Sequence, residues 1–286
     1  MSEGLTTYKA NLLLTRIKQD IRHILNLLDK LNFESIPAIL SLLREELRNS
    51  RMDKTEDEAF LNDLFVVNAY INLIERYKDY WHRIISGENA ASWNALHDAI
   101  DSLRLVKRFS NINVAFFERQ LVQLESIYPY SIFFSIGMSV SRFECSICGE
   151  NIDSFRCLHR IGELYMGTMA SAIAQDGVEL DHVSIVKNPV DKRCVQVYSE
   201  DSPGFNAVRY LSNLLTSGKA SVLSINEFSE KKFSDRNPSY IKQRRNEKCF
   251  CGSSKKLKIC CIDKEFNKRC HVYIIGWPTD VSEIVP

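Results

Sequence analysis

The chain of 286 residues is long enough for one large domain or two modest ones, and its 45% hydrophobic and 26% charged residues are an ordinary globular composition. The formal net charge of +1 excludes a strong overall attraction to nucleic acid or to a membrane surface, so such a role would need a local basic patch. No secretory leader and no apolar run of membrane-spanning length stands in the sequence, which predicts a cytoplasmic protein without a membrane partner.

Residues 1–128 predict a helical domain, because apolar residues recur at alternating steps of three and four. The stripes are Leu14, Ile17, Ile21, Ile24, Leu28 and Leu31; Leu64, Val67, Ile71, Ile74, Trp81 and Ile85; Trp93, Leu96, Ile100, Leu103 and Val106; Val114, Phe117, Leu121, Leu124 and Ile127. A shorter helix is expected over 36–47, and Thr55 with Glu58 forms a capping-box signature. Short connections favour an antiparallel bundle, and the same stripes would also suit a homo-oligomer through these helices.

Residues 129–229 predict a smaller α+β domain, and 230–244, a polar stretch with one proline, predicts a linker. Within the smaller domain we expect strands over 131–149, 178–186, 194–200 and 220–228, and an amphipathic helix over 204–218. Residues 245–286 hold a segment rich in cysteine and lysine and then an apolar strand over 270–278. The predicted fold class is α+β, with an N-terminal antiparallel helical bundle, a small zinc-stabilised β-rich domain and a C-terminal zinc knuckle.

The last segment crowds Cys249, Cys251, Cys260 and Cys261 into the pattern C-x-C-x8-C-C. Neighbouring cysteines bond to each other only with strain, whereas tetrahedral zinc accepts four thiolates. Lysines and arginines around the cluster favour the thiolate form over the thiol. They exceed what the cluster needs, which leaves a basic surface for a partner at Arg245, Lys248, Lys255, Lys256 and Lys258.

The stretch "RNEKCFCGSSKKLKICC" resembles the SEC-C motif, the zinc tail of the bacterial SecA motor that also ends many otherwise unrelated bacterial proteins. The matching residues are Arg245, Asn246, Cys249, Cys251, Gly252, Ser253, Lys255, Lys256, Cys260 and Cys261. The resemblance implies zinc at the four cysteines and a basic face that docks a protein, with a SecB-like chaperone as one candidate. Leu257 and Ile259 depart from the usual pattern, and we expect both to alter the exposed face.

A second cluster reads C-x2-C-x8-C-x-H and comprises Cys145, Cys148, Cys157 and His159. Three thiolates and one imidazole form a closed zinc site, which is structural rather than catalytic because it leaves no open coordination position. His182 and Cys194 are alternatives to His159 as the fourth ligand. The sequence therefore predicts two structural Zn²⁺ ions.

The region around this cluster is similar to a small zinc β-module associated with phage and prophage proteins. The residues that fit are Cys145, Cys148, Cys157, His159, Gly162, Tyr165, Gly167, Val183, Ser184, Asn188 and Pro189. The similarity implies no defined activity and points to a phage-defence or toxin–antitoxin context.

No P-loop, G-x-G-x-x-G, G-x-S-x-G or H-E-x-x-H motif is present, and no catalytic residue is assigned. Asp181 and His182 are adjacent, and neighbours on a strand point to opposite faces, which disfavours an acid–base pair. The sequence thus favours a zinc-binding interaction protein that docks a partner through its basic tail. Two alternatives remain, a nucleic-acid-binding protein that uses the same tail and a defence effector with an unrecognised active site.

Overall fold

The computed structural model describes residues 4–52, 57–175, 177–236, 243–249, 253–262 and 266–285, without the side chains of Met52, of 230–236 and of 266–272. The chain divides into two compact units. The first comprises 1–226 and 276–286, and the second comprises 227–275.

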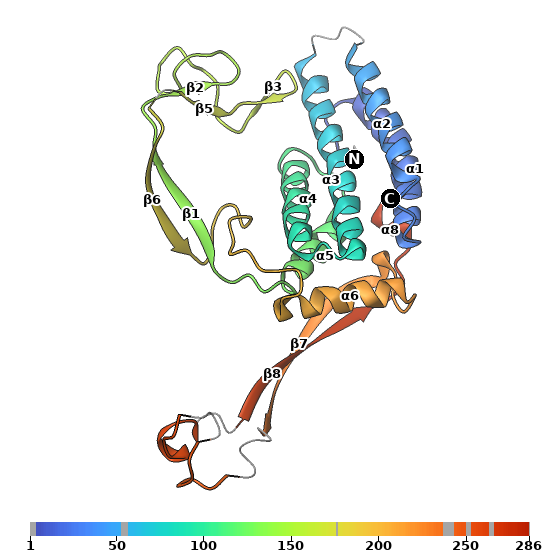
Figure 1. Ribbon diagram of the computed structural model, residues 1–286. Helices are drawn as coiled ribbons and strands as arrows, with labels where there is room; N and C mark the ends of the chain where they lie inside the picture. Colours follow the sequence, from blue (N-terminus) through green and yellow to red (C-terminus); the bar gives the residue numbers. More distant parts are fainter. Residues whose placement is uncertain are drawn as a thin grey trace. The chain divides into compact units, whose positions relative to one another are not determined.

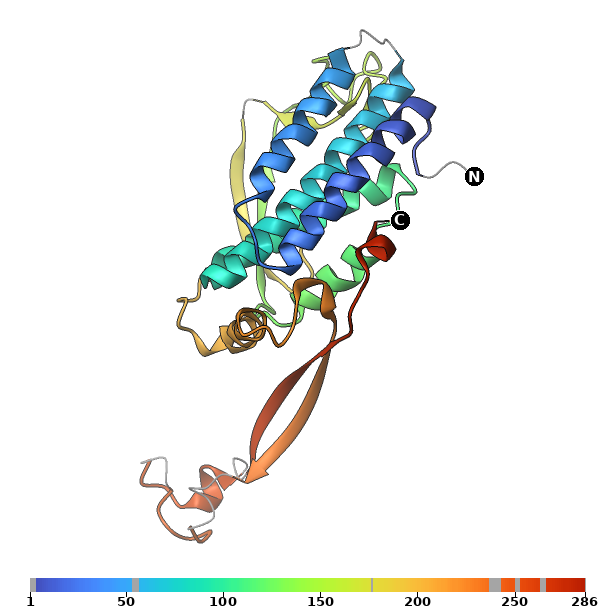
Figure 2. The same cartoon turned by 90° about the vertical axis from the view of Figure 1, so that its right-hand side faces the viewer.

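The core of the first unit is a bundle of α1 (Tyr8–Asp29), α2 (Ile36–Met52), α3 (Glu58–Ser86), α4 (Asn89–Phe109) and α5 (Ala115–Glu125). Figures 1 and 2 show α1 and α2 beside α3, and α4 packs along α3 on another side. The long central α3 buries apolar and aromatic residues along most of its length. The helical bundle predicted from the apolar stripes is therefore confirmed.

The apolar stripe of α1 is buried within the chain itself. Ile21, Ile24 and Leu28 have no exposed surface, and Leu14 and Ile17 are almost as deeply buried. Burial of such side chains is the main favourable contribution to the stability of a bundle. These residues therefore form the seam between helices of one chain.

The start of α3 differs from the predicted capping box. Asp57 is the N-cap, and its carboxylate accepts hydrogen bonds from the backbone N–H groups of Ala59 at 3.0 Å and Phe60 at 3.3 Å. Thr55 lies outside the described residues. An aspartate at this position satisfies N–H groups that have no partner within the helix and also suits the helix dipole.

Among its described residues, the first unit also contains three antiparallel two-stranded ribbons. Strand β1 (Phe133–Ser139) pairs with β6 (Glu179–Val186), β2 (Phe143–Cys145) with β5 (Ala172–Ala174), and β3 (Leu164–Tyr165) with β4 (Thr168–Met169). The strands predicted over 131–149 and 178–186 are confirmed in these elements. Together with the bundle they make the fold α+β.

The strand predicted over 194–200 is wrong, because only Val195 forms an isolated bridge there. The segment is a loop that side chains hold against α4. The indole N–H of Trp93 donates to the carbonyl of Lys192 at 2.8 Å, and Arg193 pairs with Asp98 and Asp101 at 2.5 Å each. These contacts hold the segment against α4, and its pairing with β1 is limited to the single bridge between Val195 and Phe133.

Four further elements lie in the described part of the first unit: η1 (Pro203–Phe205), α6 (Asn206–Thr216), η2 (Val222–Ser224) and α8 (Val281–Ile284). The amphipathic helix predicted over 204–218 is thereby confirmed. The strand predicted over 220–228 begins only at Ile225, because Val222–Ser224 form a 3-10 turn. The amide of buried Gln120 donates to the carbonyls of Val222 and Ile225 at 2.9 and 2.8 Å and holds this turn in place.

The second unit is built on β7 (Ile225–Arg236) and β8 (Phe266–Gly276), which pair as a two-stranded sheet. The linker predicted over 230–244 is therefore wrong for 230–236, and 237–242 lie outside the described residues. The polar composition indicated a linker, but backbone pairing with β8 does not require apolar side chains. Between the strands, η3 (Leu257–Ile259) belongs to the cysteine-rich segment. Among the helices of the described ranges, none has the length and apolar character to cross a lipid bilayer.

Two candidate metal centres

The central cluster begins with a tight turn at the end of β2. Cys145 is the last residue of that strand and lies opposite Ala172 of β5. The backbone N–H of Gly149 donates to the carbonyl of Cys145 at 2.8 Å, and that of Cys145 donates to the carbonyl of Glu150 at 2.8 Å. Gly149 has a φ of 73°, a conformation that glycine adopts without steric cost. This turn brings Cys148 back toward the strand that carries Cys145.

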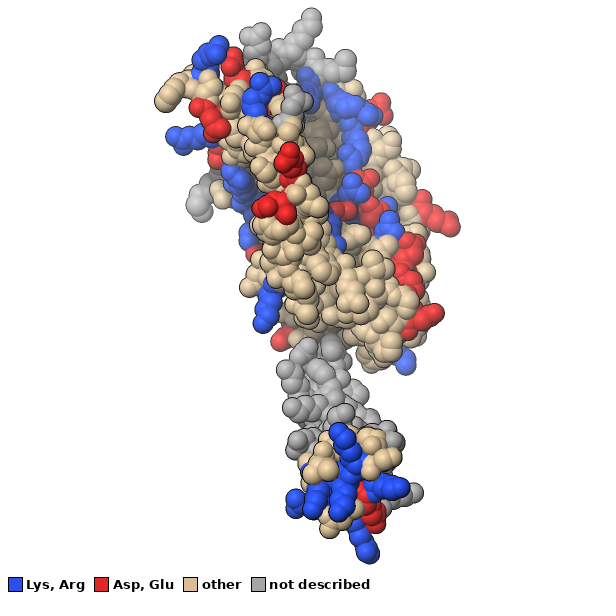
Figure 3. All heavy atoms as spheres, turned by 60° about the vertical axis from the view of Figure 1, so that its left-hand side comes forward, with Lys and Arg blue, Asp and Glu red and all other residues tan. Residues whose placement is uncertain are grey.

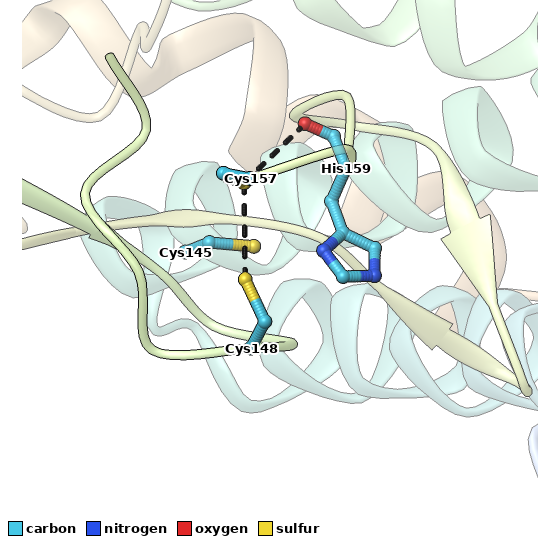
Figure 4. Close-up of side chains that lie close together, drawn as sticks. All are labelled: Cys145, Cys148, Cys157 and His159. Atoms are coloured by element: carbon cyan, nitrogen blue, oxygen red, sulfur yellow. Dashed lines mark hydrogen bonds between the residues drawn. The ribbon is translucent and has the colours of Figure 1, made fainter. Parts of the chain in front are cut away.

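The third and fourth residues of the cluster come from the loop that follows. The N–H of Cys157 donates to the carbonyl of Ser154 at 3.0 Å, and the resulting turn directs this thiol toward the first pair. The sulfurs of Cys148 and Cys157 are 3.8 Å apart. Figure 4 shows the three sulfurs converging beside the ring of His159. Ligand atoms of Cys145, Cys148, Cys157 and His159 all lie within 4.8 Å of one another.

The imidazole of His159 is the strongest sign that this cluster suits a metal ion. Its Nδ1 atom is buried and has no hydrogen-bond partner among the described residues. A buried polar atom without a partner costs free energy, and a metal ion would remove that cost. Tyr165 packs its ring edge against the imidazole at 4.6 Å between centroids and accepts a hydrogen bond from the N–H of Arg160 at 2.8 Å. The ring is thus held in position without using Nδ1.

The surroundings of Cys145 also suit a thiolate. Burial by itself would raise the pKa of Cys145, but N–H groups of Cys148 and Ile147 donate to its sulfur and leave the pKa below the usual value. The Ile147 N to Cys145 Sγ distance is 3.5 Å. Hydrogen bonds to the charged form favour that form, and a metal requires it.

The structure brings His159 into the cluster and places the two alternative ligands elsewhere. His182 lies on β6 beside Gly137. Cys194 lies in the loop over 194–200, and its own backbone carbonyl accepts a hydrogen bond from the N–H of Phe134 at 2.8 Å. The expectation that Asp181 and His182 point apart is wrong, since Asp181 Oδ2 and His182 Nδ1 are 3.0 Å apart. A bulge in β6 opposite Gly137 and Met138 breaks the alternation there.

The loop that carries the cluster is anchored on α3. The turn between β3 and β4 places the N–H of Gly167 2.8 Å from Asn62 Oδ1 and the N–H of Met166 3.3 Å from Glu58 Oε1. A Cβ on Gly167 would meet the carbonyl oxygen of Leu61 at 2.8 Å, so only glycine fits without a shift. The cluster of Cys145, Cys148, Cys157 and His159 is therefore tied to the helical bundle through one of the ribbons.

The second centre lies in the second unit. The sulfurs of Cys249, Cys260 and Cys261 lie within 4.8 Å of one another, and Cys251, the predicted fourth ligand, lies outside the described residues. The Cys260 and Cys261 sulfurs are 3.7 Å apart. The hydroxyl of Ser253 is 3.0 Å from Cys260 Sγ, a contact that sequence reasoning did not identify. Donation to a metal-bound sulfur would be one use of this hydroxyl.

The backbone of this segment folds into a small knuckle. The N–H of Cys249 donates to the carbonyl of Lys255 at 2.7 Å, and that of Leu257 donates to the carbonyl of Glu247 at 2.9 Å. Leu257 is fully buried and packs with Cys249 and Cys261. The expectation that Leu257 alters the exposed face is therefore wrong. Ile259, with 67% of its surface exposed, does alter it.

A basic surface covers this knuckle. All five residues predicted to contact a partner are exposed: Arg245, Lys248, Lys255, Lys256 and Lys258. Figure 3 shows the basic side chains gathered over the knuckle with few acidic ones among them. We call these five residues the basic face.

Comparison with known proteins identifies only the C-terminal cysteine-rich segment. Residues 245–262 match the family model of the SEC-C motif, so the C-terminal region carries that motif. No curated protein and no solved structure matches the chain. The similarity of the central region to a phage-associated module finds no support in these comparisons.

Proposed function

We propose that the chain is an adaptor that binds two structural Zn²⁺ ions and docks an acidic protein partner on the basic face of its SEC-C knuckle. The observation that carries the proposal is the arrangement of the knuckle, in which cysteines 249 and 261 are buried while the five basic side chains are exposed. The metal centre would then shape the surface, and the surface would make the contact.

Zinc is the metal that the donor sets suit best. The central group offers three sulfurs and one imidazole, and the tail offers cysteine sulfurs, which are ligands that tetrahedral zinc accepts. In the central group four protein ligands would fill the coordination sphere and leave no position for water or substrate. A closed sphere supports a structural role, in which the metal ion supplies folding free energy to a loop with little apolar core.

The choice of an acidic partner follows from charge. Lysine and arginine side chains on an exposed surface attract carboxylates and accelerate encounter, and salt screens this attraction. Lys248 and Lys256 face each other across a backbone bridge, and Lys255 and Lys258 lie on the same short segment. The SEC-C match adds one candidate, an acidic chaperone of the SecB kind, and a defence system is one setting for such an adaptor.

The proposal is tested by capture of partners from cells with the full chain and by titration of an isolated acidic partner. The double variant Lys255→Glu/Lys258→Glu should retain its metal and weaken binding at least about 10-fold, because two attractive charges become repulsive. The control variant Lys219→Glu, which changes an exposed lysine at the end of α6, should bind like the parent chain. Equal binding by the double variant and the parent would contradict the proposal.

The same basic face would also suit a nucleic acid, and one further experiment separates the two. A single-stranded oligonucleotide should bind the parent chain weakly, with an affinity that falls steeply as salt rises. If the oligonucleotide binds more tightly than every protein captured, and the double variant loses that binding, the tail acts on nucleic acid instead. The net charge of +1 favours the protein partner.

A further inference from the structure

The ribbon of β1 and β6 carries a continuous apolar face. Phe134 lies opposite Ile185, Ile136 opposite Val183, and Met138 opposite Leu180. The bulge opposite Gly137 and Met138 adds one residue to β6 and shifts its alternation by one position. Leu180 thereby joins Val183 and Ile185 on one side of the ribbon. Without the bulge, Leu180 would point to the opposite side. We call these six residues the ribbon face.

The ribbon face is exposed in the single chain. The exposed fractions of its six side chains run from 37% at Phe134 to 72% at Ile185. At typical side-chain sizes this corresponds to about 600 Å² of apolar surface, the upper end of what a soluble monomer exposes in one patch. Figure 3 brings this side of the first unit forward, and the area over the ribbon is largely free of charged side chains.

A ribbon of this kind needs a cover. Two strands alone are marginally stable in water, and a third strand or a packed layer is required for independent stability. The opposite side of the ribbon begins with Phe133, which is buried, and one edge of β1 contacts the loop at Cys194. The ribbon face itself has no such contact among the described residues, where its side chains are exposed.

A second copy of the chain fits this face by symmetry. Consider a two-fold axis that lies between the two copies, level with the Ile136–Val183 pair, and runs across the strands. It would place the Phe134–Ile185 pair of one copy over the Met138–Leu180 pair of the other. In this arrangement the apolar pairs of one copy lie against the apolar pairs of the other.

The area also suits a dimer. A standard interface buries about 800 Å² on each partner. The ribbon face supplies about three quarters of this, and Ile132 and Val178, both about half exposed, lie at its ends. We propose that the ribbon face is a homodimer interface in which the β1–β6 ribbons of two chains pack face to face as a two-layered β-structure.

The test compares two lysine substitutions on neighbouring residues of β1. Ile136→Lys places a charge at the centre of the ribbon face, whereas Ser135→Lys places the same charge on the opposite side of the same strand. Sedimentation of the full, metal-loaded chain over a dilution series should show a dimer for the parent and for Ser135→Lys. Ile136→Lys should weaken the dimer at least about 100-fold, since two buried ammonium groups would meet at the axis.

A photo-reactive phenylalanine analogue at position 136 supplies an independent readout. It should cross-link two chains and yield peptides that join one β1–β6 ribbon to another, and the analogue at 135 should not. Zinc content and helical circular dichroism confirm that each variant is folded. A parent chain that is monomeric at every concentration, or a dimer that Ile136→Lys leaves intact, would overturn the proposal. Cross-links from position 136 to the helices would do the same.

Discussion

The sulfurs of Cys148 and Cys157 lie 3.8 Å apart, although one belongs to a turn after β2 and the other to the following loop. No disulfide joins them, and both are free thiols within one group of four ligand atoms. At this separation two thiolates repel, and a metal ion between them turns that repulsion into attraction. Two cysteine sulfurs from different segments at this short distance are what a loop folded around a bound zinc ion requires.

We therefore expect Cys157→Ser to lose one metal ion per chain and to unfold the loop around β3 and β4, while the helices remain. Structural zinc contributes about 10 kcal/mol to the folding of a small module, and three remaining ligands hold it far less tightly. Metal analysis and helical circular dichroism check this together. Cys194→Ser, which removes an exposed thiol outside the cluster, should keep both ions and serves as the control. Equal metal content in the two variants would argue against the central site.

Leu257 and Ile259 predict a matched pair of outcomes in the SEC-C knuckle. Leu257→Ala should destabilise the knuckle by about 2–4 kcal/mol, because it opens a cavity beside two of the cysteines. Ile259→Ala should change the stability by less than about 0.5 kcal/mol, because most of that side chain is in water. Resistance of the tail metal to a chelator measures the difference. A faster loss of metal from the Ile259 variant than from the Leu257 variant would contradict this account.

Glu200 contacts the start of α4 from a distant part of the first unit, and we expect this contact to stabilise the fold. Its carboxylate accepts from the N–H groups of Asn89 at 2.7 Å and Ala90 at 3.1 Å, at the start of α4. Removal of a helix cap costs about 1–2 kcal/mol, so Glu200→Ala should lower the midpoint of urea unfolding accordingly. Glu88→Ala removes an exposed carboxylate that pairs with Arg83, and it should cost less than half as much.

His97 predicts a dependence of stability on pH. Burial lowers the pKa of His97 from 6.5 to about 4, and the nearby Glu125 carboxylate offsets this only in part. As the pH falls below 6.5, His97 takes up a proton in the unfolded chain but stays neutral in the folded chain. The stability linked to His97 is thus fully present above pH 6.5 and is lower by about 2 kcal/mol at pH 5 and about 3 kcal/mol at pH 4.

The variant His97→Gln isolates this contribution from the acid sensitivity of the metal centres, which both proteins share. Urea unfolding at pH 7 and pH 5 should show a smaller loss of stability for the variant than for the parent chain. An identical loss in both would mean that His97 does not titrate in this range.

Much of the fold could be predicted because helical periodicity is a local signal. The stripes of α1, α3, α4 and α5 follow directly from the spacing of apolar residues, and the cysteine spacing indicated both groups of side chains that could hold a metal ion. The tail could also be matched to a known motif, since its pattern is short and dense.

The features that could not be predicted depend on contacts between distant residues. Pairing of β7 with β8 gives a polar segment a strand conformation, and the salt bridges of Arg193 to α4 keep 194–200 as a loop. The burial of Leu257 depends on how the knuckle closes around the cysteines. The bulge in β6, which brings Asp181 to His182 and aligns the ribbon face, left no signal in the local pattern.

Metal stoichiometry of the purified full chain tests the central claim most directly. Native mass spectrometry and elemental analysis should find two zinc ions per chain, and X-ray absorption should show sulfur-rich four-coordinate spheres without bound water. Cysteine substitutions in the central group and in the tail should each remove one ion and leave the other. A chain that is folded without zinc, or a zinc sphere open to solvent, would contradict the account.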